Sequence, residues 1–148
     1  MAPKKPVEKV TFPRVVESAL ENGSGPEALY AALDLGTNSC RMLIAQPKGA
    51  QFHVIDSFAK SVQLGSGLEK TGRLSRDSMN RTIQALKVCK QKLDKYDVKY
   101  ARLIATEACR RAKNSKEFIS KVFQQTGLKL DIIDTEEEAR LAVISCAP

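Results

Sequence analysis

Tryptophan is absent from this 148-residue sequence, and aromatic residues make up only 5% of it. The core must therefore consist mainly of aliphatic side chains. No apolar stretch approaches the ~18 residues that a membrane-spanning helix needs. The Pro- and Lys-rich start is not followed by the apolar stretch of a secretory signal either. We therefore expect a soluble, cytoplasmic protein without a membrane partner.

Soft metal ligands are few and scattered along the chain. The four cysteines, Cys40, Cys89, Cys109 and Cys146, form no Cys-x-x-Cys pair. This spacing disfavours both a zinc site and a disulfide framework, so we expect reduced and buried thiols. The single histidine, His53, lies inside a strand-like pattern, which favours a structural role.

The formal net charge of +7 predicts a cationic surface that attracts anions. Nucleic acid, an acidic membrane and polyphosphate are all compatible with this charge. A basic surface without a specific partner is compatible with it as well, so charge alone does not choose among these interpretations.

The pattern of turns and apolar residues divides the chain into two parts. Residues 1–28 contain four prolines and an Asn-Gly-Ser-Gly run, which predicts a mobile N-terminal extension. Residues 29–148 form the predicted packed domain. Its apolar runs predict strands at 29–34, 40–45, 52–62, 101–105 and 128–134.

Helices are predicted between the later strands. Met79, Ile83, Leu86 and Leu93 form one apolar stripe on a helix that begins at Ser75. A short helix should cover residues 108–113, another should start at a capping box at 114–117 and end at Gly127, and a last one should open at Thr135. The order βββαβαβα predicts an α/β fold with a ribonuclease-H-like, mixed five-stranded sheet flanked by helices.

The first predicted strand ends in a candidate phosphate loop. Asp34 lies at the end of the strand, and Gly36, Thr37, Asn38 and Ser39 form the turn that follows it. Successive backbone amides in a tight turn can bind phosphate oxygens, and a glycine permits close approach and unusual dihedral angles. Asp34 would repel phosphate, so we expect it to bind Mg²⁺ beside the anion. An ordinary hairpin turn is the alternative.

Three blocks of sequence together carry a family resemblance. They are Asp34-Leu-Gly-Thr-Asn-Ser39, Ala105-Thr-Glu-Ala-Cys-Arg110-Arg-Ala-Lys-Asn114 and Ile133-Asp-Thr-Glu-Glu-Glu138-Ala-Arg140-Leu. The first block is similar to the first phosphate loop of the superfamily that contains actin, the sugar kinases and the heat-shock ATPases. All three, in this order and spacing, resemble the exopolyphosphatase and guanosine pentaphosphate phosphohydrolase (Ppx/GppA) family over residues 29–146.

The resemblance implies roles for two further side chains. Glu138 would be the catalytic general base that deprotonates the attacking water. Arg110 would face the phosphate site and bind its oxygens with a planar, permanently charged group. Two plainer interpretations stay open: Thr135 and Glu138 have the spacing of a capping box, and Arg110 could form a surface salt bridge.

The resemblance also implies a substrate and a missing half. Family members remove terminal phosphate from inorganic polyphosphate or guanosine pentaphosphate, and they continue into a second glycine-rich phosphate loop and a second ribonuclease-H-like domain. We expect that domain to be absent here. The chain would then be a partial, weakly active or inactive fragment, whose exposed apolar docking surface could also support a homodimer.

Three other functions compete with this interpretation. The truncation suits an inactive remnant that serves as a phosphate- or nucleic-acid-binding module. An ATP-dependent kinase would share the first loop, but the blocks around Arg110 and Glu138 argue against it. A nuclease needs several carboxylates around two metal ions, and the long helix offers Asp34 no obvious acidic partner, because Asp77 lies at its start and the remainder is Lys-rich. A nucleic-acid partner is therefore disfavoured.

Overall fold

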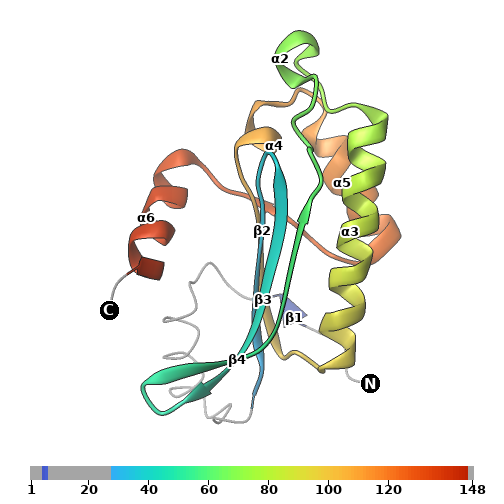
Figure 1. Cartoon of the computed structure of the whole chain (residues 1–148). Helices are drawn as coiled ribbons and strands as arrows, with labels where there is room; N and C mark the ends of the chain where they lie inside the picture. The colour runs from blue at the N-terminus through green and yellow to red at the C-terminus, as the bar shows by residue number, and fades with distance from the viewer. Residues whose placement is uncertain (1–4, 7–27, 147–148) are drawn as a thin grey trace.

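The computed structural model describes residues 5–6 and 28–146, with side chains described for residues 28–140. Helices lie on both sides of one mixed sheet, with α3 and α5 on one face and α6 on the other (Figure 1). The elements are β1 (Lys5–Pro6), β2 (Tyr30–Leu35), β3 (Ser39–Lys48), β4 (Gln51–Ser61), α2 (Leu68–Thr71), α3 (Arg76–Lys95), β5 (Tyr100–Ala105), α4 (Glu107–Arg111), α5 (Ser115–Thr126), β6 (Asp131–Ile132) and α6 (Thr135–Cys146).

The strand order β1-β5-β2-β3-β4, with β6 paired to β5, confirms the predicted α/β sheet. Strands β2, β3 and β4 form the antiparallel meander, and β5 pairs in parallel with β2. All five predicted strands are present, although β6 has only two residues where the sequence predicted a strand over 128–134. Because β2, β5 and β6 are parallel, their carboxyl ends meet at one edge of the sheet.

The predicted helix stripe is buried in the core. Met79, Ile83, Leu86 and Leu93 on α3 are each at most 4% exposed, and they belong to one apolar cluster with Leu33 of β2. Helix α3 starts as predicted, because the Ser75 hydroxyl accepts a hydrogen bond from the Ser78 amide at 3.0 Å. Most of the largest fully buried side chains are aliphatic, as a chain without tryptophan requires.

The predicted capping box at the start of α5 is wrong. The Asn114 side chain makes no cap bond. Its Oδ1 accepts from the Leu74 amide at 2.8 Å, and its Nδ2 donates to the Leu74 carbonyl at 3.0 Å. Asn114 therefore joins the start of α5 to the segment before α3. The other end of α5 follows the sequence prediction, since Gly127 has φ 78° and its amide bonds the Phe123 carbonyl.

The N-terminal extension lies mostly outside the described residues. Lys5 and Pro6 form β1, which pairs with Tyr100 and Ala101 of β5. The predicted mobility of residues 1–28 stays a prediction. Helices long and apolar enough to cross a membrane do not occur among the described residues.

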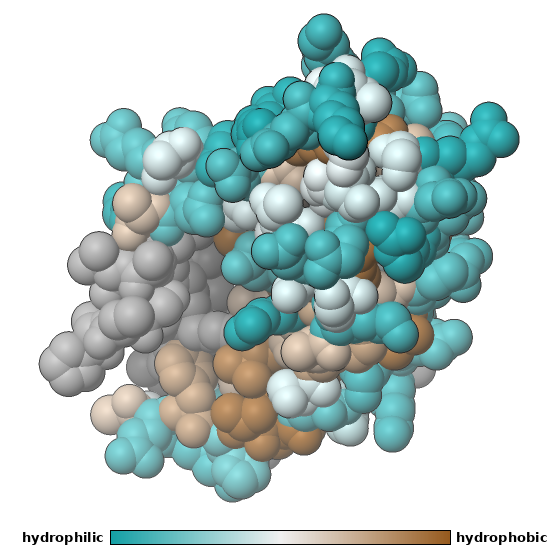
Figure 2. Space-filling model, turned by 45° about the horizontal axis from the view of Figure 1, so that its top comes forward, coloured by the Kyte–Doolittle hydropathy of each residue, from teal (hydrophilic) through white to brown (hydrophobic). Residues whose placement is uncertain are grey.

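The predicted burial of the thiols is confirmed for Cys40, Cys89 and Cys109, whereas the Cys146 side chain lies outside the described part. The face of the molecule at the carboxyl ends of β2 and β5 is largely hydrophilic (Figure 2).

Replacement of Asn114 tests its bridging role. Asn114→Ala should lower the free energy of unfolding by about 2 kcal/mol, because two buried backbone groups of Leu74 lose their partner. Urea denaturation measures this change. Ser120→Ala, at an exposed position of the same helix, is the control and should leave stability nearly unchanged. Equal stabilities for the two variants would contradict the bridging role.

Candidate active site

The turn between β2 and β3 is held from one side by residues 62–65. The Thr37 carbonyl accepts from the Gly65 amide at 3.0 Å, and the Asn38 carbonyl accepts from the amides of Val62 at 2.8 Å and Gln63 at 3.0 Å. Within a trans peptide, the N–H points opposite to the preceding carbonyl. The amides that follow these two carbonyls therefore point away from residues 62–65.

Those two amides belong to Asn38 and Ser39, which the sequence predicted as phosphate-binding residues. The turn is closed by a 3.0 Å bond from the Gly36 amide to the Ser39 carbonyl. Gly36 itself does not have a positive φ, so the turn does not use the left-handed conformation that a glycine permits. A Cβ on Gly36 would meet its nearest atoms at 3.8 Å, an ordinary contact distance.

The glycine that this site requires is Gly65, which the sequence interpretation did not select. A Cβ on Gly65 would lie 2.4 Å from Cγ2 of Thr37. Residues 62–65 therefore approach the loop so closely that a side chain at position 65 would displace it. The only sequence signal is the glycine-rich run 65–67, and it does not identify Thr37 as the neighbour.

Arg110 and Glu138 come together at the ends of β5 and β6. Strand β5 ends beside β2, where the Thr106 amide bonds the Leu35 carbonyl at 3.0 Å, and Arg110 follows one turn later on α4. Its Nη2 lies 2.9 Å from Oε1 of Glu138, and its Nη1 donates to the Ile133 carbonyl at 2.8 Å. The arginine thus connects α4 with the start of α6.

The capping interpretation of Glu138 is wrong. Helix α6 is capped by Asp134, whose Oδ1 accepts from the Glu137 amide at 2.7 Å. The neighbouring Glu137 pairs with Arg140, at 2.8 Å. Of these first-turn carboxylates, Glu138 is the one that pairs with Arg110, so its side chain is available at the strand ends.

Asp34 is close enough to Glu138 for their charges to interact. The pKa of Asp34 is raised, first because neighbouring protein removes part of the hydration of the carboxylate. The negative charge of Glu138 raises the pKa further, and the positive charge of Arg41 lowers it. Asp34 still has solvent access, because its residue is exposed at the end of β2. The structure therefore brings Asp34, Glu138 and Arg110 to one site, while their roles stay predictions.

These residues fit the predicted Mg²⁺ ion only in part. Among the described residues there is no group of three or more candidate metal ligands. Mg²⁺ needs fewer, because it is commonly held by one or two carboxylates together with waters and phosphate oxygens. The electrostatic repulsion between Asp34 and Glu138 would be relieved by a cation. Asp34 is the side chain that would hold it beside the loop.

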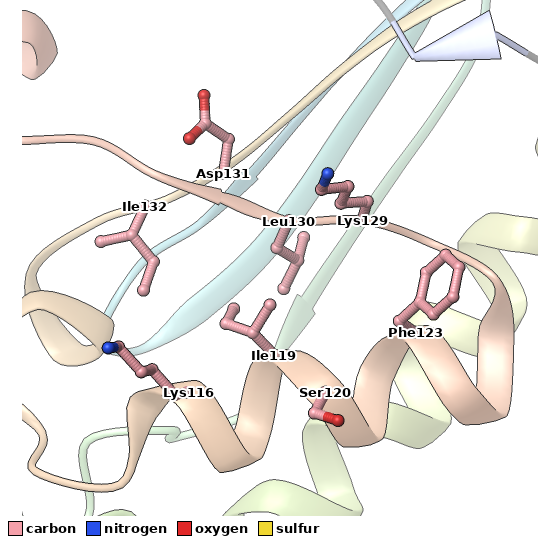
Figure 3. Close-up of a pocket in the computed structure, with 8 residues that line it drawn as sticks. All are labelled: Lys116, Ile119, Ser120, Phe123, Lys129, Leu130, Asp131 and Ile132. Atoms are coloured by element: carbon pink, nitrogen blue, oxygen red, sulfur yellow. The ribbon is translucent and has the colours of Figure 1, made fainter.

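A cavity of about 470 Å³ adjoins the loop on the side of α2. It is lined by Thr37, by residues 65–70 and by Arg111. The Arg111 side chain is 47% exposed. A larger cavity, of about 580 Å³, lies between α5 and β6 and contains none of the predicted site residues (Figure 3).

The arrangement of the sheet and helices defines a class of protein. The mixed sheet with helices on both faces, and with the candidate phosphate loop after its first long strand, has the ribonuclease-H-like arrangement that the sequence predicted. The chain matches the model of the Ppx/GppA phosphatase family over residues 43–147, and it belongs to this family. The matched range includes Arg110 and Glu138 but begins after the phosphate loop.

Solved structures of relatives agree with this assignment. A Ppx/GppA family member from Aquifex aeolicus is 37% identical, with a TM-score of 0.76, over 80% of this chain and 39% of the relative. The type II crystal variant of the Aquifex phosphatase is 38% identical, with a TM-score of 0.75, over 82% and 42%. An exopolyphosphatase from Cytophaga hutchinsonii is 25% identical, with a TM-score of 0.73, over 76% and 36%. The chain therefore spans about two fifths of the length of these relatives.

Removal of the Asp34 charge should stabilise the fold. Because the folded-state pKa of Asp34 is raised, the stability that depends on this group falls as the pH rises through that pKa. Asp34→Asn should therefore increase the free energy of unfolding at pH 7. The gain should shrink as the pH falls toward and below 3.8, the ordinary aspartate value, because both side chains are then neutral.

Urea denaturation at several pH values measures this difference. Glu117→Gln, a remote and exposed carboxylate on α5, is the matched control and should give no such gain. A lower stability of Asp34→Asn at pH 7 would show that the carboxylate is favourably placed in the fold, against the raised pKa.

Proposed function

We propose that this chain forms the half of a phosphoanhydride hydrolase that binds the terminal phosphate and carries the general base. Its substrate would be inorganic polyphosphate or guanosine pentaphosphate. The observation that carries the proposal is the 2.9 Å contact between Arg110 and Glu138, beside Asp34 and the phosphate loop. Membership in a phosphatase family and the similarity to an exopolyphosphatase support the same chemistry.

In the proposed mechanism, the terminal phosphate first competes for Arg110. A phosphate oxygen displaces the Glu138 carboxylate from Nη2, because a doubly charged anion with several acceptors binds the guanidinium more strongly. The amides of Asn38 and Ser39 bind the phosphate from the loop. These contacts place the phosphorus next to the carboxylate that has just been released.

Glu138 then acts on water. Its carboxylate orients a water molecule and accepts the proton as the water oxygen attacks the terminal phosphorus. Arg110 stabilises negative charge on the transferring phosphoryl group. A Mg²⁺ ion held by Asp34 would supply charge neutralisation at the phosphate oxygens. Asp34 lies at the end of β2, and Arg110 and Glu138 lie on the helices that follow β5 and β6, so the sheet sets their relative positions.

The same proposal limits what the chain does by itself. Phosphoryl transfer requires charge stabilisation from several sides. This chain spans about two fifths of its relatives, and the described site lies at one end of one sheet. We therefore expect phosphate binding and slow or absent hydrolysis.

Glu138→Gln separates catalysis from a salt-bridge role. The substitution should tighten binding of inorganic pyrophosphate several-fold, because Arg110 loses its competing carboxylate and the site loses a negative charge. Where the wild-type chain releases phosphate from polyphosphate or guanosine pentaphosphate, the substitution should also lower that Mg²⁺-dependent rate at least about 100-fold. Calorimetry measures binding to the 148-residue chain, and released phosphate measures turnover.

The matched control is Glu137→Gln, one residue earlier, because Glu137 pairs with Arg140. It should change neither pyrophosphate binding nor phosphate release. Arg110→Gln should weaken pyrophosphate binding. Weaker binding by Glu138→Gln, or hydrolysis at the wild-type rate, would show that Glu138 serves the fold alone.

A further inference from the structure

We infer that Arg81 is a positioning residue for the phosphate loop, and this inference rests on the proposed function. Arg81 lies on α3 and has no contact with Asp34, Arg110 or Glu138 among the described interactions. Its Nε donates to the Val62 carbonyl at 2.7 Å, and its Nη2 lies 3.1 Å from the Gln63 carbonyl. Arg81 is therefore hydrogen-bonded to residues 62–65, the segment whose amides bind the phosphate loop.

The chain of contacts has two links, and each has a defined direction. In the first link, the guanidinium of Arg81 donates hydrogen bonds to the carbonyls of Val62 and Gln63. In the second link, the amides of the same two residues donate to the Asn38 carbonyl. Because the carbonyl of Asn38 is fixed, peptide planarity fixes the direction of the next amide, that of Ser39.

The conformation of Gln63 shows that the segment needs this support. Gln63 has φ 49°, in the left-handed region that side chains with a Cβ rarely adopt. Such residues persist where surrounding contacts over-determine them. The bonds from Arg81 to Val62 and Gln63 and the bonds from their amides to Asn38 supply those contacts.

An arginine suits this position for a geometric reason. Its planar group can donate to two successive carbonyls and, from Nη2, also approaches the Ser78 hydroxyl at 3.2 Å. A lysine offers a single nitrogen and no fixed plane. The guanidinium is also anchored to a 20-residue helix, which is packed along the sheet and capped at Ser75. The loop thus takes its orientation from a rigid element.

Gly65 acts on the loop from the same segment. Its amide fixes the Thr37 carbonyl, and the absence of a side chain lets it contact the Thr37 methyl group. Because the Asn38 amide follows the Thr37 carbonyl, a substitution at Gly65 should first disturb the Asn38 amide and, through it, the adjacent Ser39 amide that depends on Arg81. This gives a second variant that reaches the loop through different atoms.

The test compares Arg81→Gln, Arg81→Lys and Gly65→Ala with the wild-type chain by amide NMR. In the free protein, all three variants should shift the Asn38 and Ser39 amide resonances and raise their hydrogen-exchange rates. Titration with inorganic pyrophosphate should show affinity at least about tenfold weaker for Arg81→Gln and Gly65→Ala. Arg81→Lys should recover only part of the loss.

Arg76→Gln is the matched control, because it removes the same charge from an exposed position at the start of α3. It should leave the two amides and the affinity unchanged. Arg81 is itself exposed, so its substitution should keep the core folded, and urea denaturation checks this.

Unchanged Asn38 and Ser39 resonances in Arg81→Gln and Gly65→Ala would overturn the inference, and so would full recovery by Arg81→Lys. Failure of the proposed function gives a different result. In that case wild-type resonances would not respond to pyrophosphate, while the substitutions would still move the two amides. That outcome would support the positioning role of Arg81 and reject phosphate binding.

Discussion

The parallel pairing of β2 with β5 is the constraint on which the candidate site depends. It places Leu35 beside Ala105, residues that are far apart in the sequence. The phosphate loop follows one strand and α4 follows the other, so the pairing sets the distance between the loop and Arg110. The bond from the Ile133 amide to the Ala105 carbonyl then brings the start of α6 to the same edge. Three separate segments meet because their strands are parallel.

The site also contains an electrostatic repulsion that lowers the stability of the fold. The negative charge of Glu138 disfavours the charge of Asp34, which is also partly desolvated. Arg41 and Arg110 offset this locally, each from a neighbouring element. A fold optimised only for stability would not keep two carboxylates here. Their proximity is typical of a site that binds a cation or an activated water. Such sites lower the stability of the folded protein.

Local patterns predicted the elements well, and non-local contacts account for the errors. The apolar face of α3 and the end of α5 at Gly127 depend on residues within a few positions of each other, so the sequence alone predicts them. The capping box at Asn114 failed because its amide binds Leu74, forty positions away. Gly65 and Arg81 were missed for the same reason, since their importance comes from Thr37 and Val62. The resemblance identified Arg110 and Glu138, but only the coordinates show that the two side chains touch.

The second contact of Arg110 changes what an incoming anion must do. One terminal nitrogen is bound to the Ile133 carbonyl, and only the other faces Glu138. In the proposed mechanism, a phosphate would replace the carboxylate while the guanidinium stays bound to the backbone. The arginine would then keep its orientation, and little conformational entropy would be lost on ligand binding. A lysine at this position would have a single ammonium for both tasks, and the anchor would be released together with the carboxylate.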